Sequence, residues 1–161
     1  MDIKIKKQID KQSVITITRN DKTITWSKLH NGMETHDLAH FAVESVLNFQ
    51  HAFYGIINMG YSIQDFVLPR DQRPFEVRPE NLHHEALITE HIVNLLEVET
   101  LNSKSENFIE TLRTILSENE LLFPEHLSQE KLDEIRALYL KLCNKWWSLN
   151  DGDELQINFT P

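Results

Sequence analysis

Two stretches of the chain alternate hydrophobic and polar residues. Ile3 and Ile5 alternate with lysines, and the segment ELQINF, residues 154–159, alternates in the same way. Because successive side chains of a strand point to opposite faces, this period of two predicts strands with one buried face. We expect strands within residues 1–28 and over 153–159, joined in one antiparallel sheet.

The segment SVITITRNDKTITW between these strands is predicted to form a β-hairpin. Asn20 and Asp21 tolerate positive φ and would form a two-residue turn between β-branched flanks. A small sheet with one apolar face has to be covered by another layer. The turn would pair the following residues on that face: Ile17 with Ile24, and Ile15 with Trp26.

The middle of the chain has helical rather than strand periodicity. Helices are predicted over residues 35–60, 79–100, 103–119 and 128–149. The first would be continuous, because it contains no proline and only Gly55 as a weak point. The others would begin at Pro79, at Ser103 with Glu106 in capping-box spacing, and after Ser128.

Pro69, Pro74 and Pro79 interrupt the pattern and predict a loop over 69–79 that is long enough to suggest a function. The predicted fold is one α+β domain, 1–161. In it, three N-terminal strands and a C-terminal strand pack on a bundle of about four helices.

The first predicted helix contains the stretch HDLAHFAVE. At 100° per residue, His36, His40 and Glu44 form one stripe, which lies away from the most apolar side of the helix. Val43 and Leu47 share this stripe, and an ordinary exposed face would carry more lysine or glutamine. We therefore expect the stripe to face a second layer of the protein.

The second predicted helix would supply that layer. His84 and His91 share its inward stripe with apolar residues, and histidines on facing helices can converge on one ion. The inward stripe would comprise Leu87, Ile88, Leu95 and Val98 with these two histidines. His83, Glu90 and Asn94 would point elsewhere.

Helix geometry limits the ligand set of such a site. Positions i and i+4 lie about 6 Å apart along the axis and can share an ion, but i and i+8 lie about 12 Å apart and cannot. The expected ligands are therefore His40 with His36 or Glu44, completed by His84 or His91. Imidazoles and a carboxylate suit zinc, nickel, iron or manganese.

The predicted chemistry of this divalent-metal site is hydrolysis. An open coordination position would hold water, and Asp37 would orient a ligand or act on that water as a catalytic residue. The absence of paired thiolates argues against a closed structural zinc site, because the chain has a single cysteine, Cys143.

A competing interpretation makes the same histidines structural. The protein would then be a binding or dimerisation module without catalysis. Neighbouring carboxylates would form hydrogen bonds with the imidazoles, and the proline-rich loop would recognise a partner or a second copy.

Two enzyme motifs match the sequence only in part. HDLAH has Asp37 where the metalloprotease pattern HExxH has a glutamate base, and His36-Asp37 lacks the further ligands of HD-type phosphohydrolases.

Charge and composition narrow the partners. The net charge of -9 argues against nucleic acid, although residues 1–28 contain seven basic and three acidic residues. RNA contact through this basic hairpin is the weakest alternative, because exposed aromatics for base stacking are missing. One cysteine, no signal peptide and no long apolar run predict a soluble cytoplasmic protein without membrane contact.

The run THDLAHFAVESVL with the following FYGIINMG resembles an uncharacterised group of small bacterial proteins. In that group a short strand region precedes an HDLxHxxVE helix, which is followed by a phenylalanine-glycine spacing. The resemblance covers roughly residues 14–66, about a third of the chain. It implies a bacterial source and no particular activity.

Overall fold

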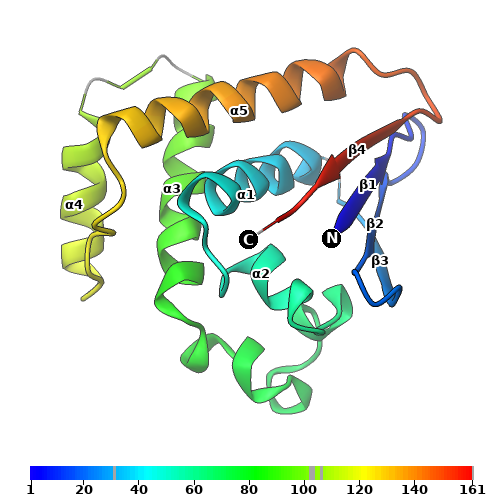
Figure 1. Cartoon of the computed structure of the whole chain (residues 1–161), viewed down its shortest axis with the longest axis horizontal. Helices are drawn as coiled ribbons and strands as arrows, with labels where there is room; N and C mark the ends of the chain where they lie inside the picture. The colour runs from blue at the N-terminus through cyan, green and yellow to red at the C-terminus, as the bar shows by residue number, and fades with distance from the viewer. Residues whose placement is uncertain (31, 102–103, 106, 161) are drawn as a thin grey trace.

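The N-terminal strands and the segment before residue 160 meet in one sheet (Figure 1). A computed structural model describes residues 1–30, 32–101, 104–105 and 107–160. The sheet is antiparallel with the order β3-β2-β1-β4, so the predicted C-terminal strand does join the N-terminal hairpin. Its strands are β1 (Asp2–Lys6), β2 (Val14–Thr18), β3 (Ile24–Lys28) and β4 (Glu154–Asn158).

One face of the sheet is buried, as the alternation predicts. Ile3 and Ile5 are fully buried, whereas the lysines between them are exposed. Ile15, Ile17 and Leu155 extend this face across β2 and β4 without any exposure. Such a face is stable only under a covering layer, and α1 supplies it.

The hairpin register differs from the prediction by one residue. Ile17 pairs with Thr25, which is buried, and Trp26 is 53% exposed on the other face. The turn is longer than two residues, because Lys22 takes a left-handed φ of 71° and the Arg19 amide donates to the Thr23 carbonyl. One added turn residue shifts every following side chain to the opposite face.

Five α-helices lie within the described residues: α1 (Met33–Leu47), α2 (Phe53–Asn58), α3 (His84–Leu101), α4 (Phe108–Glu118) and α5 (Gln129–Trp147). Ser128 caps α5 by accepting a hydrogen bond from the Lys131 amide, as expected. Pro79 opens a separate 3-10 turn over Pro79–Asn81, so α3 begins later than predicted. The capping box expected at Ser103 and Glu106 falls on residues outside the described part.

The prediction of one continuous helix over 35–60 is wrong. The chain leaves α1 at Asn48, whose φ of 55° is left-handed, and it re-enters a helix at Phe53. The Phe49 amide donates to the Glu44 carbonyl at 3.0 Å, a contact that closes the helix end. Asn tolerates this conformation better than most residues, which makes Asn48 a suitable point for the break.

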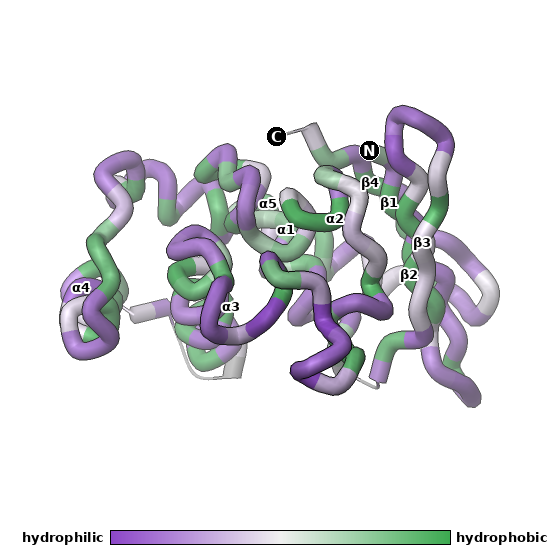
Figure 2. The backbone as a smooth tube through the Cα atoms, turned by 90° about the horizontal axis from the view of Figure 1, so that it is seen from below, coloured by the Kyte–Doolittle hydropathy of each residue, from purple (hydrophilic) through white to green (hydrophobic). Residues whose placement is uncertain are grey.

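The first helix lies at the centre of the molecule. Figure 1 shows the sheet on one side of α1, α5 passing above it, and α3 and α4 on the side away from the sheet. The buried apolar side chains of these elements form one cluster. Figure 2 shows hydrophobic residues along α1, α2 and the facing strands, with mostly hydrophilic loops around them.

A long segment of 3-10 turns, residues 61–83, connects α2 to α3. Val77 is buried to 1% exposure and Ile63 to 8%, so this proline-rich connection packs on the body of the protein. Ser62 and Asp65 form a capping box at its start. Among the described residues, no helix is both long and apolar enough to cross a membrane.

Candidate metal centre

Two histidines of α1 and one glutamate of α3 converge on a single point. His36 and His40 are one turn apart, and their Nε2 atoms lie 3.1 Å from each other. Glu90 approaches from α3, with its Oε1 3.4 Å from His40 Nε2. The three ligand atoms all lie within 4.8 Å of one another.

These separations match the edges of a metal coordination polyhedron. Ligand atoms held 2.0–2.1 Å from a tetrahedral zinc ion stand about 3.3–3.4 Å apart. The observed 3.1 Å and 3.4 Å are close to that spacing. The third pair, His36 Nε2 and the Glu90 carboxylate, lies within 4.8 Å, so Glu90 would have to move toward His36 for the three groups to hold one ion, and a fourth position would remain for water.

The opposite ring nitrogens face carboxylates. His36 Nδ1 lies 3.0 Å from Glu97 Oε1, and His40 Nδ1 lies 3.6 Å from Glu44 Oε1. A carboxylate bonded to Nδ1 holds the proton on that nitrogen and leaves the Nε2 lone pair for a metal. The His36 ring has this arrangement, whereas the His40 ring faces Glu44 at a distance too long for a hydrogen bond.

Glu44 is fully buried behind His40, where it also ties α2 to α1. Its Oε2 accepts hydrogen bonds from the Tyr54 amide at 2.9 Å and the Gly55 amide at 3.1 Å. Its Oε1 has no hydrogen bond, and neither has the facing His40 Nδ1. Burial raises the pKa of Glu44, opposed by its contacts with His40 and with the two amides.

The electrostatics of the cluster favour positive charge at His40. Burial opposes protonation of this ring, but Glu44 and Glu90 outweigh burial and raise the pKa of His40 to about 9. The hydrogen bond from His40 lowers the pKa of Glu90. A ring with this pKa carries protons on both nitrogens near neutral pH, so a divalent cation would take the place of the Nε2 proton among the same carboxylates.

Asp37 lies next to this group without being part of it. The residue is 7% exposed, and its Oδ2 atom has no hydrogen-bond partner. Burial raises the pKa of Asp37 to about 7, a value suited to proton transfer near neutral pH. Its backbone carbonyl accepts a hydrogen bond from the Tyr54 hydroxyl at 3.2 Å.

The structure brings together only part of the predicted ligand set. His36 and His40 converge, but Glu44 lies behind His40, as the spacing along one helix requires. His84 is exposed at the start of α3 and His91 is partly exposed, and neither belongs to the group. The third position is taken by Glu90 instead.

The roles of Glu90 and Glu97 were not predicted from the sequence, because the expected rotation of α3 about its axis was wrong. The buried face of α3 comprises Ile88, Thr89, Ile92, Val93 and Leu96, whereas Val98 is 53% exposed. Glu90 and Glu97 flank this face two helical turns apart. Because they are seven residues apart, they lie on the same side of the helix. This spacing is the signal that could have indicated that both face the histidines of α1.

A second group, formed by His51, His83 and Glu85, could also hold an ion. Its geometry is less suitable, because His83 Nδ1 accepts a hydrogen bond from the Glu85 amide at 3.2 Å. Glu85 Oε2 accepts the amides of Gln50 and His51, at 2.8 and 2.6 Å. These side chains already form hydrogen bonds at the start of α3, so the group of His36, His40 and Glu90 is the better candidate for a metal site.

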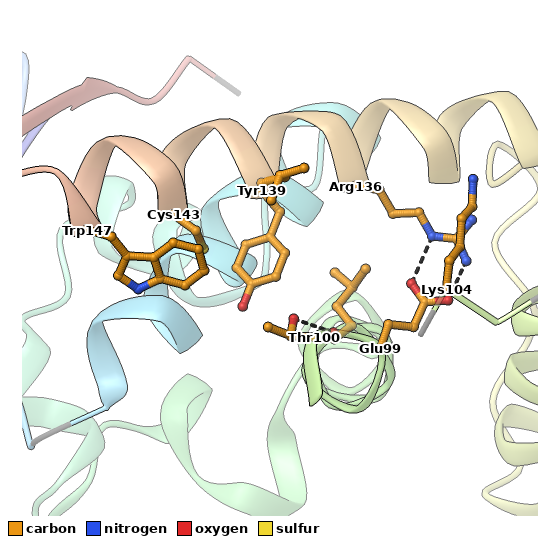
Figure 3. A pocket seen from close by; sticks show the side chains of 9 residues that line it. Glu99, Thr100, Lys104, Arg136, Tyr139, Cys143 and Trp147 are labelled. Atoms are coloured by element: carbon orange, nitrogen blue, oxygen red, sulfur yellow. Dashed lines mark hydrogen bonds and ion pairs between the residues drawn. The ribbon is translucent and has the colours of Figure 1, made fainter. Parts of the chain in front are cut away.

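Another pocket lies between α3 and α5, with a volume of about 380 Å³ (Figure 3). Tyr139 and Cys143 line it from α5, opposite Thr100 of α3. Burial raises the pKa of Cys143 to about 11, which leaves the thiol protonated and unreactive. At one end Arg136 pairs with Glu99. The pocket therefore lacks an activated base or nucleophile.

Comparison with known proteins finds no matching family model, no matching curated protein and no matching solved structure. The geometry of the chain itself is therefore the basis on which its function is proposed.

Proposed function

We propose that this protein binds one divalent metal ion through His36, His40 and Glu90. The observation that carries the proposal is the separation of the Nε2 atoms and the carboxylate, which fits one ion, with both Nδ1 atoms facing carboxylates. Zinc, nickel, iron and manganese all accept imidazole with carboxylate. The group differs from the sequence prediction in one ligand, Glu90.

The chemistry that such a centre favours is metal-assisted hydrolysis. Three protein ligands leave an open position, which in hydrolytic zinc sites holds an activated water. Asp37 is the proposed base, because its unpartnered Oδ2 is buried beside the group and its pKa is near neutrality. Hydrolysis of a generic ester such as p-nitrophenyl acetate would then depend on metal and fall in Asp37→Asn.

Metal titration tests the binding step directly. Protein purified without a histidine tag is stripped with chelator and titrated with zinc, nickel and manganese. Calorimetry gives the affinity, and plasma mass spectrometry gives the bound metal. We expect one equivalent of metal per protein chain. His36→Ala and Glu90→Gln should each lower the metal affinity by more than the 10–100-fold that is typical when an outer-shell partner is removed. Both side chains are partly exposed, so their replacement should leave the fold intact.

His84→Ala is the matched control. His84 lies on α3 near the site but outside the group, so its loss should leave the affinity unchanged. Absence of bound metal would contradict the proposal. A loss of affinity in His84→Ala or His91→Ala, with none in His36→Ala, would instead return the site to the ligands expected from the sequence.

The second candidate function is a binding module with structural histidines. One observation favours it: the ring nitrogens already contact each other and three carboxylates, Glu44, Glu90 and Glu97. This network could hold α1 against α3 without an ion. The protein would then bind no metal, and His36→Ala would lower its melting temperature equally with and without chelator.

The cytoplasmic location and the bacterial source remain predictions from the sequence. A homodimer or a protein partner would belong to the second candidate function, and sedimentation at several concentrations would detect self-association.

A further inference from the structure

A small cavity adjoins the proposed metal centre. Its volume is about 110 Å³, and His40 and Glu90, two of the three proposed ligands, form part of its wall. A molecule in this cavity would therefore lie next to the ion. The segment 61–83 contributes Phe66, Arg73, Val77 and Leu82 to its wall.

Most of the wall is apolar. α2, the segment 61–83 and α3 each contribute hydrophobic side chains. The Phe53 and Phe66 rings are 5.2 Å apart, and Phe53 also meets the His40 ring edge-on at 6.0 Å. The apolar lining comprises Phe53, Ile56, Phe66, Val77, Leu82 and Ala86.

The volume sets the size of the occupant. An apolar cavity of about 150 Å³ is enough for benzene, so 110 Å³ suits a body no larger than that ring. We take this to mean about four to six non-hydrogen atoms. Long acyl chains and sugars exceed it.

Among the described residues that line the cavity, Arg73 is the one lysine or arginine. Its Nε donates to the Leu68 carbonyl at 2.7 Å, which fixes the guanidinium at the wall. Within the described part of the chain, Arg73 forms no ion pair with an acid, in contrast to Arg70 and Arg136. An arginine held in this way is suited to a carboxylate, which it can bind through two parallel hydrogen bonds.

We infer that this cavity binds a small aliphatic carboxylate, whose charged end pairs with Arg73 and whose apolar body lies against Phe53 and Ile56. The inference rests on the proposed metal function, because the ion would offset the negative charge of Glu90 in the same wall. The substrate class of the site is therefore a short carboxylic acid with its hydrolysable group directed at the ion.

The test uses butyrate as the probe and butyramide as its neutral isostere. Binding is measured by calorimetry and by ligand-observed NMR, on zinc-loaded and on metal-free protein. We expect butyrate to bind the loaded form, with butyramide at least about tenfold weaker. Octanoate, which exceeds the cavity, should also bind more weakly.

Two variants locate the binding. Arg73→Gln should abolish the preference for butyrate, whereas Arg70→Gln, an exposed arginine paired with Glu80, should not change it. Ala86→Leu fills the cavity without changing its charge and should weaken butyrate and butyramide alike. If butyrate binding is absent in both forms, or is unaffected by Arg73→Gln, the inference is overturned.

The two proposals fail separately. Zinc binding without butyrate binding overturns the carboxylate site and leaves the metal proposal standing. Butyrate binding that Arg73→Gln removes, in a protein that takes up no zinc, supports the carboxylate site and counts against the metal centre.

Discussion

The Nδ1 atom of His36 and the Oε1 atom of Glu97 lie 3.0 Å apart, so that one imidazole connects α1 to α3. The carboxylate comes from two turns beyond Glu90 on the same helix. It fixes the ring with Nε2 directed at His40. Orientation of a ligand by an outer carboxylate is a recurrent device in metal proteins.

Replacement of that carboxylate should weaken metal binding without abolishing it. We expect Glu97→Gln to lower zinc affinity about 10–100-fold, because the amide holds the Nδ1 proton less strongly. Calorimetric titration measures the change. Glu110→Gln, an exposed glutamate on α4, serves as the control and should leave the affinity unchanged. An unaltered affinity in Glu97→Gln would mean that His36 is not oriented through Nδ1.

A second prediction concerns Gly55, in α2. A Cβ atom there would lie 2.2 Å from the Gln50 carbonyl oxygen and 2.9 Å from Gln50 Cα. The loop cannot easily give way, because Glu85 holds the Gln50 and His51 amides. Although alanine is favoured over glycine in helices by about 1 kcal/mol, the clash should dominate. We expect Gly55→Ala to lower the free energy of unfolding by about 2–3 kcal/mol.

Urea denaturation measures this loss. Asn58→Ala, at the end of the same helix, is the control and should stay within about 0.5 kcal/mol of the parent. A neutral or stabilising Gly55→Ala would show that the loop over 48–52 can move.

The hairpin register leads to a third prediction. Trp26 is 53% exposed, so Trp26→Thr should change the free energy of unfolding by no more than about 0.5 kcal/mol. Ile17 is fully buried on the opposite face, and Ile17→Ala should cost about 2–5 kcal/mol. Thermal or urea denaturation compares the two. A large loss in Trp26→Thr would favour the register with Trp26 in the core.

The buried thiol gives a fourth prediction. Burial raises the pKa of Cys143 from its ordinary 9.0 to about 11, so at pH 8 its thiolate fraction is about 100-fold lower than in an open chain. Alkylation by iodoacetamide should be slower in the native protein than in urea by at least that factor. Because the folded pKa is raised, the thiol's contribution to stability is complete below pH 9 and is lost as pH rises through 11.

Mass spectrometry of timed samples follows the alkylation. Rapid labelling of the native protein would mean that solvent reaches Cys143 from the pocket between α3 and α5. In Cys143→Ala, the free energy of unfolding should fall less between pH 9 and 11 than it does in the parent protein.

The strands could be predicted because one-sided burial leaves a period of two in the sequence. Ile3, Ile5 and Leu155 all lie where that period places them. The hairpin register could not be derived in the same way. It depends on a left-handed φ at Lys22, and lysine carries no preference for that conformation.

The helix break and the position of Glu90, the third proposed ligand, depend on tertiary contacts. No proline or glycine marks residues 48–52, yet the chain turns there, and the Glu44 carboxylate meets the Tyr54 and Gly55 amides. The spacing of His36 and His40 was sufficient to pair them. The rotation of α3 brings Glu90 to these histidines. It could not be predicted from the sequence, because hydrophobic side chains lie on both faces of this helix and either face could be buried.

The pairing of β1 with β4 has a consequence for how the protein is made. Asp2 pairs with Asn158, and the Phe159 ring packs 6.1 Å from Phe41 of α1 and 5.7 Å from Tyr54 of α2. β1 leaves the ribosome well before β4, and it remains without this second neighbour until synthesis has passed residue 158. Contacts so distant in sequence form late and slow folding. A nascent chain that is released before β4 is made would leave the backbone groups along this edge of β1 unpaired and would depend on chaperones.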